Sequence, residues 1–300
     1  MKISMEQLDF WEIEVSPKVT NVASVPQRSP FRYPGGKTWL VPRIRQWLKS
    51  LPSKPKKFVE PFAGGGITGL TVAFENLADI VVLVEKDEQV AAVWKTIITA
   101  DNGAEWLANE IVKFNLTPES AKLLLSSHPA STKNLALKTI IQNRISHGGI
   151  LANGAGLLKN GENGKGILSR WYPATLKKRI MNISKVRKQI TFIQGDGFEV
   201  LKKYLDKPDV AFFVDPPYTA SKKKAGTRLY KYHQVDHEKL FELMSKLKGD
   251  FLMTYDDADE VRALALKYRF ETRLVAMNNT HHDTMMELLI GRDLSWVDKF

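Results

Sequence analysis

Short apolar runs that end in acidic residues alternate with amphipathic segments along much of the chain. The runs KKFVE at 56–60 and DIVVLVE at 79–85 each precede a segment whose apolar residues recur at helical spacing. Apolar runs of this length are typical of strands buried in a parallel sheet. Their alternation with helices predicts an α/β fold with a doubly wound sheet, whose ligand lies at the carboxyl ends of the strands.

The segment before the first of these strands predicts a helix. In TWLVPRIRQWLKSL, residues 38–51, the residues Trp39, Leu40, Ile44, Trp47 and Leu48 fall on one helical stripe. Pro42 is compatible with this helix only in its first turn, where its missing N–H has no partner to lose.

The strand pattern returns near residue 189 with the runs ITFIQ, VAFFV, FLMTY and RLVAM, and MMELLIG at 285–291 follows a loop suited to an antiparallel hairpin. Residues 99–188 between the two strand regions show helical and glycine-rich patterns. The pattern therefore predicts one domain formed by residues 31–98 and 189–300, an inserted, mostly helical region at 99–188, and an extended N-terminal arm at 1–30.

A glycine-rich turn follows the first strand. In AGGGITG, the residues Gly64, Gly66 and Gly69 have GxGxxG spacing between a strand and a helix, and Glu85 ends the next strand. Small residues let the backbone approach a cofactor closely, and a carboxylate at the second strand accepts hydrogen bonds from a ribose. The pattern indicates a nucleoside cofactor, either a nicotinamide dinucleotide or S-adenosylmethionine, with a plain tight turn as the alternative.

The sequence DPPY follows the strand at 210–214. Pro216 and Pro217 restrict the backbone and lack N–H groups, which leaves the Pro216 carbonyl able to accept a hydrogen bond beside Asp215. Tyr218 adds a flat aromatic face. Together these groups match the two N–H donors and the ring of an aromatic amine. The alternative is a surface turn, which Asp-Pro-Pro also favours.

Charge indicates the class of partner. Lys and Arg exceed Asp and Glu, for a net charge of +11, so the protein attracts polyanions, with nucleic acid first among them and simple solubility as the alternative. Cysteine is absent, which excludes disulfides and thiolate chemistry and fits a reducing compartment. The N-terminal sequence has no continuous apolar core, so we expect a cytoplasmic protein without a membrane span. His281 to Asp283 are a poor metal site, and we expect no metal.

Three motifs in order, RYPGGK, EPFAGGG and DPPY, resemble those of the DNA adenine-N6 methyltransferases of the Dam type, the class alpha amino-methyltransferases. The resemblance covers Phe31 to about Glu85 and Gln189 to Gly291. It implies a Rossmann-like, S-adenosylmethionine-dependent methyltransferase sheet that modifies double-stranded DNA in a bacterium or phage. A cognate restriction endonuclease is a further candidate partner.

The resemblance also implies roles for individual residues. Lys37 would bind the cofactor's carboxylate, Glu85 its ribose, and Asp196 would lie near its adenine. The implied cofactor-binding residues are Tyr33, Gly36, Lys37, Glu60, Phe62, Ala63, Gly64, Gly65, Gly66, Glu85 and Asp196. A flipped adenine would donate hydrogen bonds to Asp215 and Pro216 and stack on Tyr218, with Pro217 holding the turn rigid. The implied catalytic residues are therefore Asp215, Pro216, Pro217 and Tyr218.

The inserted region departs from the resemblance, because its glycine-rich stretch at 147–173 does not match the segment that reads GATC in Dam-type enzymes. We expect it to contact DNA through basic side chains, with a flexible loop and a solvated helix face as the alternative. The predicted DNA-binding residues are Arg32, Arg144, Lys159, Lys165, Arg170, Lys177 and Lys178. Two other functions stay open at this point, a nicotinamide-dependent oxidoreductase and a non-catalytic nucleic-acid-binding protein, and RNA remains a candidate substrate.

Overall fold

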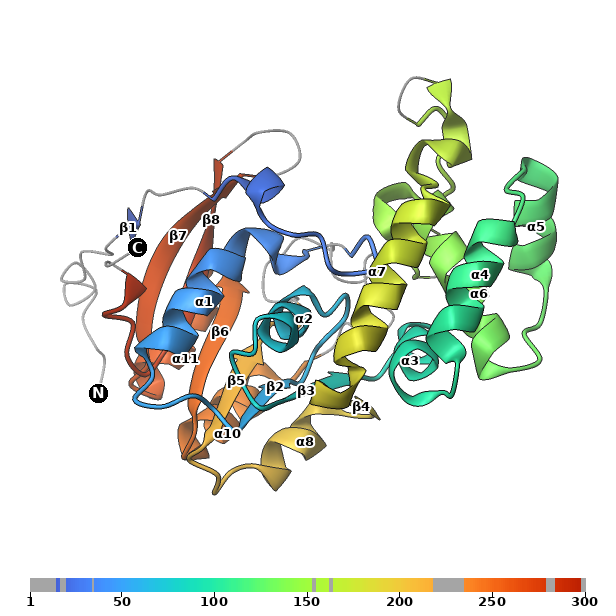
Figure 1. Ribbon diagram of the computed structural model, residues 1–300. Helices are drawn as coiled ribbons and strands as arrows, with labels where there is room; N and C mark the ends of the chain where they lie inside the picture. The colour runs from blue at the N-terminus through green and yellow to red at the C-terminus, as the bar shows by residue number, and fades with distance from the viewer. Residues whose placement is uncertain are drawn as a thin grey trace.

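A computed structural model describes most of the chain, and the statements below concern those residues: 15–16, 20–33, 35–152, 155–161, 164–217, 235–278 and 284–297. Eight strands form one sheet in the order β1-β7-β8-β6-β5-β2-β3-β4 (Figure 1). Their bounds are β1 Val15–Ser16, β2 Lys57–Glu60, β3 Ile80–Glu85, β4 Ile190–Gln194, β5 Val210–Val214, β6 Asp250–Asp256, β7 Glu271–Asn278 and β8 Thr284–Gly291.

All neighbouring strands in this sheet are parallel except those that pair with β8. Strand β8 runs antiparallel to both β6 and β7, which confirms the predicted C-terminal hairpin. The chain passes from β2 outward to β3 and β4, then returns to β5 on the other side of β2. The carboxyl ends of β2 and β5 therefore lie side by side at the point where the strand order reverses, which is where ligands bind in open α/β sheets.

Helices cover both faces of the sheet, as a doubly wound fold requires. Alternation along the strands sends Phe58 and Phe213 into one hydrophobic cluster and Val59 and Phe212 into the other. The first cluster includes residues of α1 Val41–Ser50, α2 Ile67–Phe74 and α3 Glu88–Trp94, the last of which continues into the π-helical turn η4 Lys95–Thr99. The second includes residues of α8 Gly197–Lys203, α10 His237–Lys246 and α11 Asp259–Lys267.

Helix α1 confirms the pattern at residues 38–51. Ile44, Trp47 and Leu48 are buried on its inner face, and Pro42 lies in its first turn. A short 3-10 turn, η3 Lys37–Leu40, precedes the helix and carries Trp39 into the same core.

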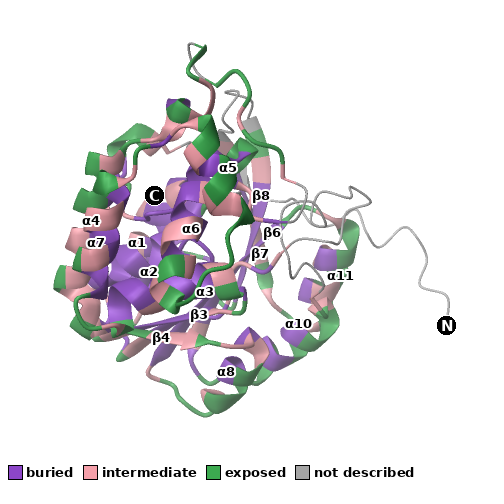
Figure 2. Ribbon diagram, turned by 90° about the vertical axis from the view of Figure 1, so that its right-hand side faces the viewer, coloured by how far each residue is buried: buried purple, intermediate pink, exposed green. Residues whose placement is uncertain are grey.

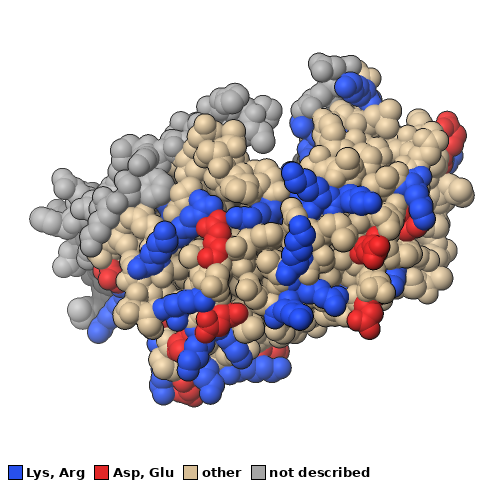
Figure 3. Space-filling model, viewed as in Figure 1, with Lys and Arg blue, Asp and Glu red and all other residues tan. Residues whose placement is uncertain are grey.

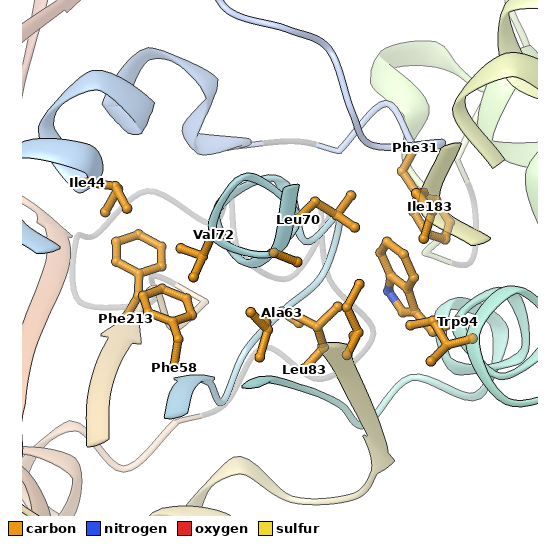
Figure 4. Packing of buried hydrophobic residues seen from close by; sticks show 14 of the residues in the cluster. Phe31, Ile44, Phe58, Ala63, Leu70, Val72, Leu83, Trp94, Ile183 and Phe213 are labelled. Carbon is orange, nitrogen blue, oxygen red and sulfur yellow. The ribbon is translucent and has the colours of Figure 1, made fainter. Parts of the chain in front are cut away.

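The inserted region is helical, as the sequence predicts. It contains α4 Gly103–Lys113, α5 Pro118–Ser126, α6 Thr132–Ile145 and α7 Pro173–Val186, with short 3-10 turns η5 His147–Gly149 and η7 Gly166–Arg170. Ile140, Ile180 and Ile183 join the same buried cluster as Trp94 of α3. Figure 4 shows Ile183 and Trp94 within this cluster. The inner faces of these helices are buried and their outer faces are exposed (Figure 2). The region therefore packs on the sheet domain through a shared core.

The N-terminal arm contributes an edge strand and a 3-10 turn to the described structure. Strand β1 pairs with β7 at the edge of the sheet. Further along, Val22–Ser24 form the 3-10 turn η2, and Phe31, the residue that follows the arm, packs against Trp94 with ring centroids 5.6 Å apart. Among the helices of the described ranges, none has the length and apolar character needed to span a membrane.

Candidate active site

The glycine turn after β2 is packed against two aromatic side chains of the protein itself. Gly64 and Gly66 have φ values of +46° and +61°, in the left-handed region that favours glycine. A Cβ at Gly64 would lie 2.5 Å from Cε1 of Tyr33, and one at Gly66 would lie 3.0 Å from Cζ2 of Trp94. Trp94 Nε1 also donates a hydrogen bond to the Gly64 carbonyl at 3.0 Å. The two rings occupy the space that side chains at positions 64 and 66 would need, which explains why both residues are glycine.

Residues 29–33 are fixed between the glycine turn and the inserted region. Ser29 Oγ donates to the Gly65 carbonyl at 2.5 Å. Asn143, on α6 of the inserted region, binds the backbone of Arg32. Its Oδ1 accepts from the Arg32 N–H and its Nδ2 donates to the Arg32 carbonyl, both at 2.8 Å. These contacts place the Tyr33 ring over the turn, where Gly36 N–H closes the segment by donating to the Tyr33 carbonyl at 3.1 Å.

Glu85 lies at the carboxyl end of β3 and accepts three backbone hydrogen bonds. Its Oε2 accepts from Gly64 N–H at 3.0 Å, and its Oε1 accepts from the N–H groups of Lys86 and Asp87, each at 2.8 Å. Burial raises the pKa of Glu85 to about 7 despite these bonds. Ala63 N–H donates to the Val84 carbonyl at 2.9 Å, which ties the turn to β3. The predicted ribose-binding carboxylate is thus anchored to the glycine turn.

Asp196 and Phe62 both contact the beginning of α8 at the same edge. Asp196 caps α8 by accepting from Phe198 N–H at 2.9 Å, and its Oδ2 lies 3.0 Å from Lys86 Nζ. Phe62 packs edge-to-face on Phe198, with centroids 6.2 Å apart. The structure therefore brings the two predicted cofactor-binding residues together at the start of α8, next to β3.

Glu60 is a buried carboxyl at the end of β2. Its Oε2 accepts from Gly69 N–H at 2.9 Å. Burial raises its pKa to about 8, and the nearby charge of Asp215 adds to the shift. A Cβ on Gly69 would lie 2.7 Å from Glu60 Oε2, so the third glycine of the GxGxxG pattern makes room for this hydrogen bond.

Asp215 follows β5 and is held by a buried lysine and a threonine. Its Oδ1 lies 2.9 Å from Lys37 Nζ and accepts from Thr254 Oγ1 of β6, also at 2.9 Å. Lys37 Nζ lies 3.0 Å from Glu287 Oε1 of β8 as well. The side chains of Lys37 and Glu287 are 4% and 5% exposed, so the water that would screen their interaction is excluded. Thr254 of β6 and Lys37 therefore set the orientation of the Asp215 carboxylate.

Lys37 has hydrogen-bonding partners within the protein on three sides. An ammonium group has three N–H donors. Those of Lys37 face the Gly35 carbonyl at 3.0 Å, Asp215 and Glu287, and the two carboxylates raise its pKa against the effect of burial. These contacts direct Lys37 toward Asp215, whose orientation it helps to set, and its ion pair with a cofactor carboxylate stays a prediction.

Sequence reasoning missed Glu287 and Thr254. Glu287 is the one acidic residue in MMELLIG, an otherwise apolar strand. An acid in a buried strand requires a partner, and this signal was available in the sequence. Thr254 lies in a similar apolar run, FLMTY, and its hydroxyl gives no comparable indication.

The rest of DPPY is described only in part. Pro216 is buried and Pro217 is half-buried, directly after β5. Tyr218 lies outside the described residues, so its stacking role stays a prediction. His281 to Asp283 also lie outside them, and the described part of the chain contains no group of His, Asp and Glu residues that could hold a metal.

The predicted DNA-binding residues differ in exposure. Lys159, Lys165, Lys177 and Lys178 are exposed, and Lys and Arg side chains gather over α7 on the face shown in Figure 3. Arg32 and Arg170 are half-buried. Arg144 is buried, at 6% exposure, and its Nη2 donates to the Pro30 carbonyl. This side chain lies inside the packed junction of α6 with residues 29–33, and its contact with DNA stays a prediction.

Known proteins match the chain in sequence and in fold. Residues 33–100 and 159–279, more than half of the chain, match the family of D12 class N6 adenine-specific DNA methyltransferases. The structure is similar to the precorrin-6y C5,15-methyltransferase of Geobacter metallireducens GS-15, at 8% identity over 84% of this chain and 87% of that one, with a TM-score of 0.37. It is also similar to the rRNA methyltransferase aviRa of Streptomyces viridochromogenes, at 13% identity over 84% of each chain, with a TM-score of 0.38. No curated protein sequence matches it.

Proposed function

The chain belongs to the D12 class of N6 adenine-specific DNA methyltransferases, and from this premise we propose that it transfers the methyl group of S-adenosylmethionine to N6 of a flipped adenine in DNA. The observation that carries the proposal is the placement of Asp215. This carboxylate follows β5 where β5 neighbours β2 and its glycine turn, and Lys37 and Thr254 hold it there.

The described residues fit the cofactor in charge and hydrogen bonding. Glu85 and Asp196 line the carboxyl edge of β3 and the start of α8, and their carboxylates can accept hydrogen bonds from hydroxyl and amine groups. Lys37 faces two carboxylates, so the three groups together carry an excess of one negative charge when ionised. This excess suits a sulfonium cation, which supplies the methyl group when it is bound.

Asp215 acts on the adenine amine by hydrogen bonding. The N6 lone pair is conjugated with the ring, and N–H bonds to the Asp215 carboxylate and to the Pro216 carbonyl would turn it toward the methyl carbon. S-adenosylmethionine would supply the methyl carbon when bound, with its S–C bond breaking as the N–C bond forms. The methylated nitrogen would then carry the positive charge and lose one proton, for which the Asp215 carboxylate is the proposed acceptor. Lys37 and Thr254 keep the carboxylate in this orientation throughout.

The two other functions considered from the sequence account for less of the site. A nicotinamide-dependent oxidoreductase explains the glycine turn but requires no buried lysine behind Asp215. A non-catalytic nucleic-acid-binding protein explains the basic charge but requires no oriented carboxylate. Equilibrium binding of S-adenosylmethionine and of NAD to the purified protein separates the first of these from a methyltransferase.

The decisive experiment is expression in a bacterial host that lacks adenine methylation, followed by mapping of modified adenines by long-read sequencing. We expect N6-methyladenine at one recognition sequence with the wild-type protein and none with Asp215→Ala. Asp206→Ala, which removes an exposed acid in the loop before β5, is the matched control and should methylate as the wild type does. Methylation of RNA but not DNA by the purified protein, or equal methylation by Asp215→Ala, would contradict the proposal.

A further inference from the structure

Glu60 is a buried acid whose two carboxyl oxygens differ in their contacts. It ends β2, directly before the glycine turn, and it is 3% exposed. Its Oε2 accepts from Gly69 N–H, whereas its Oε1 makes no hydrogen bond to the described residues. Within the described ranges no cation pairs with Glu60, and the charge that acts on it is that of another acid, Asp215. Glu60 is therefore an acid in the core without a counter-charge.

Glu60 and Asp215 face the same side of the sheet from neighbouring strands. Phe58 of β2 and Phe213 of β5 point into the same hydrophobic cluster. Because side chains alternate along a strand, the residues two positions further on, Glu60 and Asp215, share that side. Strands β2 and β5 are adjacent and parallel, so the two acids lie together at the carboxyl edge of the sheet.

Three acids and one ammonium group share this buried region. Lys37 contacts two of the acids, Asp215 and Glu287, and Glu60 is the third. With all four groups ionised, the region would hold an excess of two negative charges. A buried carboxyl that has no counter-charge keeps its proton, because ionising it away from water is costly. Glu60 is thus the acid expected to be neutral, in agreement with the rise of its pKa to about 8.

The elements packed against β2 supply no cation of their own to Glu60. Helix α2, which contributes Gly69, has no ionisable residue. Strand β3 ends in Glu85, another acid, whose hydrogen bonds go to backbone N–H groups. Lys37, from the turn η3 before α1, is directed at Asp215 and Glu287. Among the described residues no positive charge is therefore paired with Glu60, and a bound cation would be the first.

The methyl donor of the proposed reaction is such a cation. S-adenosylmethionine has a sulfonium group, and its product S-adenosylhomocysteine has a neutral thioether at the same place. Asp215 is the proposed partner of the adenine amine, and the methyl group must lie within bonding reach of that amine. The sulfonium charge would then lie at the edge of the sheet that Glu60 shares with Asp215. An opposite charge nearby favours the ionised form of a carboxyl group.

We infer that Glu60 is protonated in the free protein and gives up its proton to solvent when the sulfonium binds, so that the site distinguishes the methyl donor from its neutral product by charge. The inference rests on the proposed function, because it needs S-adenosylmethionine as the cofactor. The only bond that breaks is the O–H bond of Glu60, and the buffer accepts the proton. Once the sulfonium charge has been used up by methyl transfer, Glu60 takes up a proton again, which favours exchange of product for new cofactor.

Calorimetry at pH 7 in two buffers of different ionisation enthalpy counts the protons released on binding. The wild type should release up to about one proton more with S-adenosylmethionine than with S-adenosylhomocysteine. Glu85, with a pKa of about 7, can release a proton with either ligand because both carry the ribose, so the difference between the ligands excludes its contribution. Glu60→Gln should reduce the difference to near zero. Glu105→Gln, at an exposed acid of α4, should keep the wild-type difference.

Affinities measured across the pH range test the same linkage. Burial raises the pKa of Glu60 to about 8 in the free protein, so below this pH binding of a cation must remove a proton. The preference of the wild type for S-adenosylmethionine over S-adenosylhomocysteine should therefore rise by up to about tenfold per pH unit toward pH 8 and then level off. In Glu60→Gln this rise should disappear. The ionisation of each ligand is common to both proteins and cancels in their comparison.

Two further arms keep the test independent of one variant. Asp215→Asn removes the negative charge that acts on Glu60, so it should reduce the proton release at pH 7 even where Glu60→Gln does not fold. An analogue with a protonated amine in place of the sulfonium should release as many protons from the wild type as S-adenosylmethionine does, because the charge and not the methyl group is responsible.

The outcomes separate the inference from the proposed function. Binding of both ligands to the wild type with equal proton release would overturn the inference and leave the proposed function standing. An undiminished difference in Glu60→Gln would do the same. Failure of S-adenosylmethionine to bind would refute both. The expected proton release in a protein that methylates no DNA would refute only the proposed function.

Discussion

Lys37 Nζ lies 2.9 Å from Asp215 Oδ1, which joins the lysine of PGGK to the acid of DPPY within the core of the protein. The same ammonium contacts Glu287 of β8, so two carboxylates compete for one positive charge. A lysine that is shared between two carboxylates orients Asp215 but neutralises only part of its negative charge. In the proposed reaction, the balance between the two acids would set how strongly Asp215 attracts the N–H groups of adenine.

Glu287→Gln should slow methyl transfer with little effect on cofactor affinity. The amide keeps an acceptor for Lys37 but removes one charge, so Lys37 pairs more strongly with Asp215 and weakens it as an acceptor. We expect kcat to fall by about tenfold, which corresponds to about 1.4 kcal/mol. Glu260→Gln, an exposed change on α11, is the control. A change confined to the KM for S-adenosylmethionine would contradict this role.

Lys37→Met should destabilise the protein, because it leaves two carboxylates without their buried partner. Breaking a buried ion pair by removing one member costs about 3–5 kcal/mol. Lys37→Met combined with Glu287→Gln should recover part of that loss, since fewer negative charges then remain unpaired. Denaturant unfolding of the two single variants and the double variant measures the coupling, and strict additivity would show that the two side chains do not interact.

Glu60→Gln should make the stability of the protein less dependent on pH. Burial raises the pKa of Glu60 from its ordinary 4.5 to about 8, so the folded state holds a proton that the unfolded state releases between these values. The contribution of Glu60 is therefore fully present below pH 4.5 and is lost as pH rises to about 8. Relative to the variant, the wild type should lose up to about 1.4 kcal/mol per pH unit in this window.

Glu75→Gln is a control in which the effect of pH on stability has the opposite sign. Although burial favours the neutral form of Glu75, its bonds with Arg45 and Arg28 lower its pKa. Its stabilising contribution is therefore present above pH 4.5 and is lost as pH falls through its lowered pKa. Unfolding curves across the pH range should show the two variants diverging from the wild type at opposite ends, and parallel wild-type and Glu60→Gln curves would refute the assignment for Glu60.

Glu85→Ala should weaken S-adenosylmethionine binding. Hydrogen bonds to a charged group contribute about 1.5–3 kcal/mol, so the dissociation constant should rise by about tenfold to a hundredfold. Calorimetry without DNA measures it, with Glu199→Ala, an exposed acid of α8, as the control. An unchanged constant would remove Glu85 from the cofactor site and leave it as an anchor of the glycine turn.

Replacement of Tyr218 should give a graded loss of activity. Stacking of a base on an aromatic ring contributes about 1–3 kcal/mol. Tyr218→Phe and Tyr218→Trp should therefore keep most of the methyl transfer rate, and Tyr218→Ala should lose it. If Phe were as inactive as Ala, the hydroxyl would be the functional group and the stacking interpretation would fail.

The sequence predicts the sheet well because its strands carry strong local signals. The runs at 79–85 and 210–214 are apolar almost throughout, since helices cover both of their faces, and the glycines at 64–66 mark the turn between β2 and α2. The place of Pro42 is likewise readable, because only the first turn of a helix accepts it. These features depend on neighbours a few residues away.

The features that the sequence does not reveal depend on contacts between distant segments. The two residues before Lys37 are glycines, which suggest a cofactor loop, whereas its carboxylate partners lie directly after β5 and in β8. Arginine is usually a surface residue, but α6 packs Arg144 against Pro30. No local pattern reports either relationship, although Glu287 within an apolar strand is a usable sign that a buried partner exists.

The place of β8 between β6 and β7 gives the active site a dependence on the order of folding. Glu287 and Lys37 are separated by most of the chain, and contacts of such long range form slowly because a large loop must close first. Until β8 pairs with β6, Glu287 cannot compete with Asp215 for Lys37. The charge balance around Lys37 therefore depends on the long-range pairing that joins the C-terminal hairpin to the rest of the sheet.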